Sequence, residues 1–397
     1  MIPVANHKWV VWVLLASTTL VRIPSAVALG VALPALTAEL ALDAAQQGWL
    51  GSALSLPGVL LGIPAAWYCA RFNPRHLQTA VLAAGSALIF AQGWAPGLEA
   101  LLLTRMLAGV VFTGMQPAQT LLLRQWFTPR EMPLVSGSRA AVIGLVEAAT
   151  FSLAAPLVAA AGWRFAFQAL GAIGAAVTVT WLAFGPKYVP EPAEPVTPGL
   201  SENPLSLLRR HPALAAMTLG AFGAPAAWWA YVVFWPSYML ERFGMPVEVS
   251  GPLFALTSLG MTPGALFVGW LCNRLPLLRG PALIICGAVL TGASWGMLLT
   301  DNVTALVILA SGVGLAWGFI AVMGGLAFQL PGIQPRETAV ASSIIWTATG
   351  IGELAGPALA GVLALATGDV ATALAAAAAL SCGLVAGGVA VRRLPAP

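Results

Sequence analysis

Charged residues are scarce in this sequence. Asp, Glu, Lys and Arg together make up 8% of the 397 residues, apolar residues make up 59%, and the mean hydropathy is +0.87. Soluble domains carry roughly 25% charged residues, so this composition excludes an ordinary soluble protein. The apolar residues also do not alternate with polar ones as they do in the strands of a transmembrane barrel. They form unbroken runs of about 20 residues, which predict membrane-spanning helices.

Residues that hold metals or perform covalent chemistry are also few. The four cysteines lack the paired spacing of a disulfide framework or a metal site, and none of the three histidines lies inside an apolar run. The motifs G-K-[ST] and H-E-x-x-H do not occur. The glycines of "GIGELAGPALAG" lie within an apolar run, where small residues serve helix packing rather than dinucleotide binding. We therefore expect no metal, no cofactor and no enzymatic activity.

What the sequence does contain is a series of apolar runs long enough to cross a bilayer as helices. Twelve runs are present, at 9–36, 46–69, 77–96, 98–123, 133–160, 164–185, 213–240, 249–272, 279–299, 303–329, 338–366 and 370–391. The first run is too long for the core of a signal peptide, so we predict that it is retained as a helix. An even number of spans places both termini on one side of the membrane.

The basic residues indicate which side that is. Of the 18 Lys and Arg residues, 14, including Arg139, fall on the side shared by the termini, whereas only Arg164 and Arg242 fall on the other side. Positive charge collects on the cytoplasmic side, so we predict cytoplasmic termini in a bacterial inner membrane. The pI of 9.1 then reflects topology and contact with anionic lipid rather than binding of nucleic acid.

One polar segment divides the runs into two groups of six. The stretch from Gly185 to Pro212 inclusive holds seven prolines, a composition that favours extended linker conformations. We predict an N-terminal half at 1–185, a cytoplasmic linker at 186–212 and a C-terminal half at 213–397.

Short phrases recur in the two halves. "AWYCAR" begins at position 66 and "GWLCNR" at position 269, and "PRE" occurs at 129–131 and again at 335–337. In each half a second glutamate, Glu147 or Glu353, follows the glutamate of "PRE" by 16 residues. The offsets of 203 and 206 residues agree closely, which indicates that the halves arose by duplication.

These features resemble the major facilitator superfamily of transporters over essentially the whole chain. The superfamily's loop motif between spans two and three, G-x-x-x-D-R-x-G-R-R, is matched in part by Arg71 and Arg75, and in the second half by Gly269, Asn273 and Arg274. The resemblance implies an all-α membrane protein of 12 transmembrane helices in two pseudo-symmetric six-helix halves. It also implies a monomer that works by alternating access, with gating roles for Arg71, Arg75, Asn273 and Arg274.

Two further motifs carry the resemblance. In the fourth run, Arg105 and Gly109 match the superfamily's R-x-x-x-G pattern, and "GWRFAF" at 162–167 is similar to the usual junction of spans five and six. In the first run, "VRIPSAVALGVALPAL" is similar to the branch of cyanate and nitroimidazole permeases.

The sequence also departs from the family pattern. Ala70 and Asn273 replace the two loop-motif aspartates, which in the family help to latch the halves together on the cytoplasmic side. The antiporter motif of span five keeps small residues at 152–160 but not its glycines, which weakens an assignment as a drug antiporter.

Four formal charges lie deep within the apolar runs: Arg22, Arg105, Glu147 and Glu353. Each is expensive to insert into a bilayer, so each is a candidate functional group. Arg22 is a candidate site for an anion, because a guanidinium group suits carboxylate oxygens. Glu147 and Glu353, with Arg105 as a partner, are candidates for proton coupling. Spans one, four and five are neighbours in the family fold, so the resemblance implies that Arg22, Arg105 and Glu147 cluster in the N-terminal half.

Structural roles remain open for the same residues. Arg105 can hydrogen-bond backbone carbonyls and brace helices, Arg22 and Glu147 can form a purely structural ion pair, and Glu353 can be a structural carboxyl group.

Aromatic residues form the last group of candidates. Trp228, Tyr231 and Trp235 share one face of the seventh run, and Trp317 and Trp346 lie in runs ten and eleven. The family fold implies that these residues line a substrate cavity. The alternative is a set of lipid-facing or interfacial aromatics.

Together these observations predict a secondary transporter for a small organic solute, more specifically a small anion, driven by proton symport. One alternative is a proton-driven efflux pump for amphipathic compounds, and another is a membrane sensor that does not transport. The expected partners are the solute, protons and the lipid bilayer.

Overall fold

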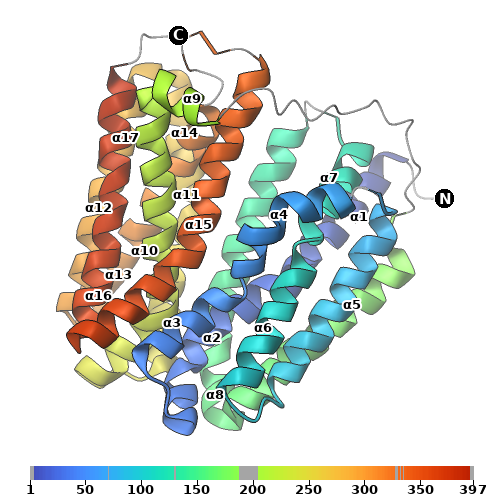
Figure 1. Cartoon of the computed structure of the whole chain (residues 1–397), viewed down its shortest axis with the longest axis vertical. Coiled ribbons are helices and arrows are strands. Elements are labelled where there is room, and N and C mark those ends of the chain that lie inside the picture. Colours follow the sequence, from blue (N-terminus) through green and yellow to red (C-terminus); the bar gives the residue numbers. More distant parts are fainter. Residues whose placement is uncertain are drawn as a thin grey trace. The chain divides into compact units, whose positions relative to one another are not determined.

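The structure is a computed structural model that describes residues 4–69, 71–128, 131–186, 204–326, 330, 332–333 and 335–393. Within these ranges every regular element is a helix, which confirms the predicted all-α class (Figure 1). The chain divides into two compact units, one made of Met1–Asp43 and Trp49–Ala193 and the other of Ala44–Gly48 and Glu194–Pro397. Residues 187–203 of the predicted linker lie outside the described residues.

The predicted runs of the N-terminal half appear as eight helices. These are α1 (Val4–Ser17), α2 (Thr19–Leu40), α3 (Ala44–Ala53), α4 (Leu56–Cys69), α5 (Pro74–Gln92), α6 (Leu98–Phe112), α7 (Met115–Trp126) and α8 (Met132–Phe184). The first, second and fourth runs are each split into two helices by a short break. At the first break the hydroxyl group of Thr18 donates back to the carbonyl oxygen of Leu15 at 2.6 Å.

Helix α8 holds the fifth and sixth runs together. Its 53 residues would extend about 80 Å as one straight helix, far more than a bilayer requires. Gly162 interrupts it with φ +80° and ψ 163°, a backbone conformation that only glycine adopts without strain. The predicted junction at "GWRFAF" is therefore confirmed, and it turns at its glycine.

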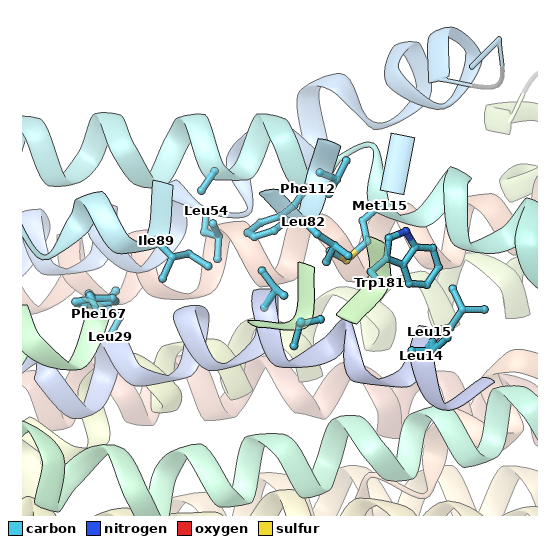
Figure 2. Close-up of a cluster of buried hydrophobic side chains, with 14 of the residues drawn as sticks. Leu14, Leu15, Leu29, Leu54, Leu82, Ile89, Phe112, Met115, Phe167 and Trp181 are labelled. Atoms are coloured by element: carbon cyan, nitrogen blue, oxygen red, sulfur yellow. The ribbon is translucent and has the colours of Figure 1, made fainter. Parts of the chain in front are cut away.

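The first unit is held together by a continuous apolar core (Figure 2). Leu29 of α2, Leu82 of α5 and Phe167 of α8 are almost completely buried within it, and Trp181 of α8 is 1% exposed. In contrast, Leu60 and Leu153 remain 66% and 68% exposed. Large exposed apolar side chains are typical of a surface that faces lipid.

The second unit is built around one buried helix. Its elements are α9 (Pro204–Arg210), α10 (Pro212–Phe243), α11 (Val247–Arg274), α12 (Arg279–Leu299), α13 (Val303–Ala316), α14 (Phe319–Leu326), α15 (Pro335–Thr367), α16 (Val370–Ala379) and α17 (Gly383–Arg392), with two 3₁₀ turns at Pro276–Leu278 and Leu380–Cys382. Helix α10 is buried over most of its length and packs against α15, α16 and α17 (Figure 1).

Two glycines allow α15 to approach α10 closely. A Cβ atom on Gly352 would lie 2.2 Å from the carbonyl oxygen of Phe222, and one on Gly356 would lie 2.1 Å from that of Ala226. Any larger residue would push the helices apart, so the expected packing role of these glycines is confirmed. The same contact fixes the position of Glu353 on α15.

Nine helical segments among the described residues are long and apolar enough to cross a membrane. One of them, Ser138–Phe184, contains two predicted runs separated by Gly162. The second run, which forms α3 and α4, and the third, which forms α5, are helical but are not among the nine. Each of the twelve predicted runs therefore has a helical counterpart.

Candidate functional site

Arg105 of α6 is completely buried, and its guanidinium group is held by three acceptors. Its Nε donates to the carbonyl oxygen of Leu50 at 3.0 Å, and its Nη1 donates to that of Ser25 at 3.3 Å and to the side-chain oxygen of Gln92 at 3.2 Å. These acceptors belong to α2, α3 and α5. Arg105 thus joins four helices through hydrogen bonds, the geometry of the bracing alternative.

Arg22 of α2 is in a different situation. It is half-buried within an apolar segment, and no hydrogen bond or ion pair joins it to another residue in the described part of the chain. The expected cluster of Arg22, Arg105 and Glu147 is therefore not linked, because Arg105 bonds elsewhere and Arg22 makes no ion pair. A charged side chain in such a segment is costly to insert and is therefore a candidate functional group.

The two candidate proton carriers lie in different units. Glu147 of α8 is 6% exposed in the first unit, on the helix that packs against α2. Glu353 of α15 is half-buried in the second unit, between the two glycines that contact α10. Both carboxyl groups lie well inside apolar helical segments.

The aromatic residues gather inside the second unit. Trp228 stacks on Phe254 with ring centroids 5.3 Å apart and meets Trp317 edge-on at 5.5 Å. The hydroxyl group of Tyr231 donates to the carbonyl oxygen of Ser294 at 2.9 Å, and the indole N–H of Trp235 donates to that of Met297 at 3.3 Å. The lipid-facing alternative is therefore wrong for these four candidates, all of which are buried.

A small cavity lies beside this cluster. Trp228, Tyr231, Ser294 and Trp317 are among the residues that line it, and it has room for about one water molecule. The indole N–H of Trp317 is buried without a hydrogen-bond partner among the described residues. Trp346 does not join the cluster, since its side chain is 53% exposed.

The four gating candidates lie at exposed helix ends or loops. Arg71 lies over the ring of Tyr68 at 5.9 Å, and Arg274 lies over the ring of Trp270 at 5.8 Å. The side chain of Arg75 donates to the carbonyl oxygen of Leu182 at 3.3 Å. Asn273 is exposed.

The repeated "PRE" glutamates form equivalent ion pairs in the two units. Glu131 pairs with Lys8 near the start of the first run, and Glu337 accepts from Arg210 at 2.6 Å near the start of the seventh. The Lys8 ammonium group and the hydrogen bonds from Thr128 lower the pKa of Glu131 from 4.5 to about 2. The duplication is therefore visible in contacts as well as in sequence.

Comparison with known proteins identifies the family of this chain. The model of the Major Facilitator Superfamily matches residues 15–357. The chain belongs to the major facilitator superfamily. The curated relatives of this transporter include a probable sulfoacetate transporter of Cupriavidus necator, which is 24% identical over 86% of this chain and 84% of its own length. They also include a D-galactonate transporter of Escherichia coli O6:H1, at 22% identity and 82% of each chain.

A third relative transports an aromatic acid. The 3-(3-hydroxy-phenyl)propionate transporter of Escherichia coli K12 is 28% identical to the transporter described here, over 86% of this chain and 84% of its own length. These relatives give no support to the finer resemblance to cyanate and nitroimidazole permeases.

Solved structures share the fold of the transporter. The nucleoside transporter NupG has a TM-score of 0.77 at 14% identity, covering 98% of this chain and all of its own. A bacterial homologue of the human lysosomal transporter Spinster has a TM-score of 0.74 at 18% identity, covering 98% and 95%.

The sequence did not point to one polar group in the first unit of the transporter. Arg139 of α8 donates to the side-chain oxygens of Gln119 and of Gln116, the latter at 3.2 Å. The only sequence signal for this group is the position of Arg139 within the run 133–160, since Arg139 counts among the basic residues on the side of the termini. In the structure Arg139 lies at the start of the apolar segment Ser138–Phe184.

Proposed function

We propose that this transporter carries a small organic anion across a bacterial cytoplasmic membrane by alternating access of its two halves. The observation that supports the proposal best is the half-buried Arg22, which has no ion pair with any described residue despite lying in an apolar helix. The anionic solutes named for its relatives, sulfoacetate, D-galactonate and 3-(3-hydroxy-phenyl)propionate, agree with this chemistry. We place both termini in the cytoplasm, from the distribution of basic residues.

We further propose that protons drive the transport through Glu353 or Glu147. Both carboxyl groups lie in apolar helical segments, where a charged side chain is costly to place, so each is a candidate functional group. Arg105 then holds α2, α3, α5 and α6 in register through its three hydrogen bonds.

In this proposal the aromatic residues line the substrate cavity. Trp228, Tyr231, Trp235 and Trp317 form a buried aromatic cluster in the second unit, and Trp346 has an exposed indole ring on α15. The cavity beside them is too small for an organic acid, so substrate contact at Trp317 requires side-chain movement. Arg71, Arg75, Asn273 and Arg274 are proposed to control the cytoplasmic opening.

Uptake into proteoliposomes tests the proposal. The purified protein is reconstituted, an inward proton gradient is imposed, and uptake of labelled sulfoacetate, D-galactonate and 3-(3-hydroxyphenyl)propionate is measured. We expect at least one anion to accumulate, and the gradient to increase its initial rate several-fold. Accumulation of cationic drugs but not of anions would favour the efflux alternative, and binding without flux would favour the sensor.

Substitution of the glutamates separates coupling from binding. We expect Glu353→Gln to abolish gradient-driven accumulation while exchange of internal for external anion continues, because exchange does not require net proton movement. Glu147→Gln is the parallel variant in the first unit. If both variants respond to the gradient as the wild type does, neither glutamate couples protons.

A further inference from the structure

The polar group around Arg139 is held in place by neutral side chains. Gln119 is 2% exposed, its side-chain oxygen accepts from Arg139, and its side-chain nitrogen donates to the hydroxyl group of Thr18 at 2.8 Å. Thr18 in turn donates to the carbonyl oxygen of Leu15. This chain of hydrogen bonds runs from α8 through α7 to the break between α1 and α2, so it fixes the direction of the Arg139 side chain.

The same chain leads to Arg22. Thr18 immediately precedes α2, and Arg22 follows it by four residues, which places the two side chains on one face of the helix and one turn apart. Helix α2 packs directly against α8, which carries Arg139. The two arginines are close enough for their positive charges to act on one another.

Neither arginine has a carboxylate partner within ion-pair distance among the described residues. Within the described part of the chain, the side chain of Arg139 donates to the amide oxygens of Gln116 and Gln119, and Arg22 makes no such bond. Arg22 lies within one apolar segment and Arg139 at the start of another, and the two cations repel each other unless a ligand supplies negative charge. Arg139 and Gln119 also line a small pocket with Trp12, Leu15 and Val135.

We propose that Arg139 is a second anion-binding residue, and that with Arg22 it makes the first unit selective for substrates that carry two negative charges. The inference rests on the proposed function, because it takes Arg22 as the first contact of the substrate. Arg22 binds one acidic group of any substrate. Arg139, oriented by Gln119, binds the second acidic group of a dicarboxylate or of a carboxylate with a sulfonate group.

Matched pairs of ligands test this selectivity. Galactarate and D-galactonate share a six-carbon hydroxylated chain and differ by one carboxylate, and succinate and butyrate differ in the same way. Affinities are measured on the purified full-length protein by calorimetry at low ionic strength. We expect the wild type to bind the better dianion at least about tenfold more tightly than its monoanion partner.

The variants assign the preference to a residue. Arg139→Gln should weaken the dianion at least about tenfold and change the monoanion less than about threefold, whereas Arg22→Gln should weaken both. Arg242→Gln removes an exposed arginine of the second unit and is the control, with no expected change. If Arg139→Gln does not fold, Arg139→Lys decides instead. The lysine variant keeps the positive charge and should retain a preference for the dianion. The preference should be smaller than in the wild type, because lysine cannot make the bidentate contact of a guanidinium group.

Several results would overturn the inference. Arg139 does not determine selectivity if Arg139→Gln lowers the affinity for both ligands equally or for neither. If Arg139→Gln does not fold, the same conclusion follows when Arg139→Lys binds both ligands as the wild type does. If Arg22→Gln loses binding while Arg139→Gln binds both ligands as the wild type does, the inference about Arg139 fails and the proposed function stands. Absence of binding of any anion to the wild type would overturn both.

Discussion

At the scale of the residue, the two arginines within apolar helices differ in their hydrogen-bond partners. Arg105 is completely buried but has neutral acceptors on three neighbouring helices, so its charge is satisfied by carbonyl dipoles. Arg22 is half-buried and has no such acceptor among the described residues. A satisfied charge stabilises the fold, and an unsatisfied one is available to a ligand.

The Arg105 network leads to a prediction about stability. Arg105→Leu leaves the carbonyl oxygens of Leu50 and Ser25 and the side chain of Gln92 without their donor. We expect a loss of about 2–4 kcal/mol, seen as a lower melting temperature in detergent. Arg242→Leu, at an exposed position, should change the melting temperature little. Equal stability of the two variants would show that Arg105 is not a brace.

The pair of Glu131 and Lys8 leads to a prediction about pH. The pKa of Glu131 is about 2 in the folded protein and 4.5 ordinarily, so the carboxylate contributes stability above pH 4.5 that is lost as the pH falls toward 2. Thermal unfolding of wild type and Glu131→Gln at pH 6 and pH 3 measures this contribution. The difference between the two proteins should be larger at pH 6, and a difference that does not change with pH would contradict the assignment.

At the scale of the element, close helix contacts depend on the absence of a side chain. Helices α10 and α15 meet at Gly352 and Gly356, where an added Cβ atom would overlap backbone carbonyl oxygens. Helix α8 turns at Gly162 because that position requires a positive φ. These positions link single glycines to the path of long helices.

The contact between α10 and α15 leads to the third prediction. Gly356→Ala should destabilise the protein by about 1–3 kcal/mol, because the methyl group cannot fit without separating the helices. Gly292→Ala on α12 is the matched control, since a Cβ atom there meets nothing within 4 Å. Alanine is also the better helix former, so Gly292→Ala should be neutral or stabilising. Comparison of the two melting temperatures checks the prediction, and a Gly356→Ala protein as stable as the wild type would contradict it.

Much of the helical order follows from the sequence, because apolar runs in a membrane have few alternatives to helix. The turn at Gly162 was also predictable, from the motif that surrounds it. The partners of Arg105 were not, because Leu50 and Ser25 act through backbone carbonyl oxygens that no side-chain pattern reveals. The bond between Arg139 and Gln119 depends on the relative rotation of α7 and α8, which is set by packing. For the same reason the sequence could not tell buried tryptophans from lipid-facing ones.

At the scale of the whole molecule, the duplicated halves have come to carry different chemistry. The ion pairs of Glu131 with Lys8 and of Glu337 with Arg210 repeat in both units. The first unit carries Arg22 and Arg139, whereas the second carries the buried aromatic cluster. The two units thus share these ion pairs and differ in the groups that we propose to bind substrate.

The distribution of basic residues leads to a prediction about topology. In a variant without its four natural cysteines, a cysteine introduced at Arg393 or Lys8 should react with a membrane-impermeant maleimide only after the cells are made permeable. A cysteine introduced at Arg164 or Arg242 should react in intact cells. Labelling in the opposite pattern would reverse the orientation.

The central claim is that the counter-ion of Arg22 is the substrate. The most direct measurement is the affinity of the purified protein for its transported anion, compared between wild type, Arg22→Lys and Arg22→Gln. Loss of a buried charge-assisted contact should weaken binding by about 30-fold or more in Arg22→Gln, with an intermediate effect in Arg22→Lys. An affinity of Arg22→Gln equal to that of the wild type, in a folded protein, would contradict the account.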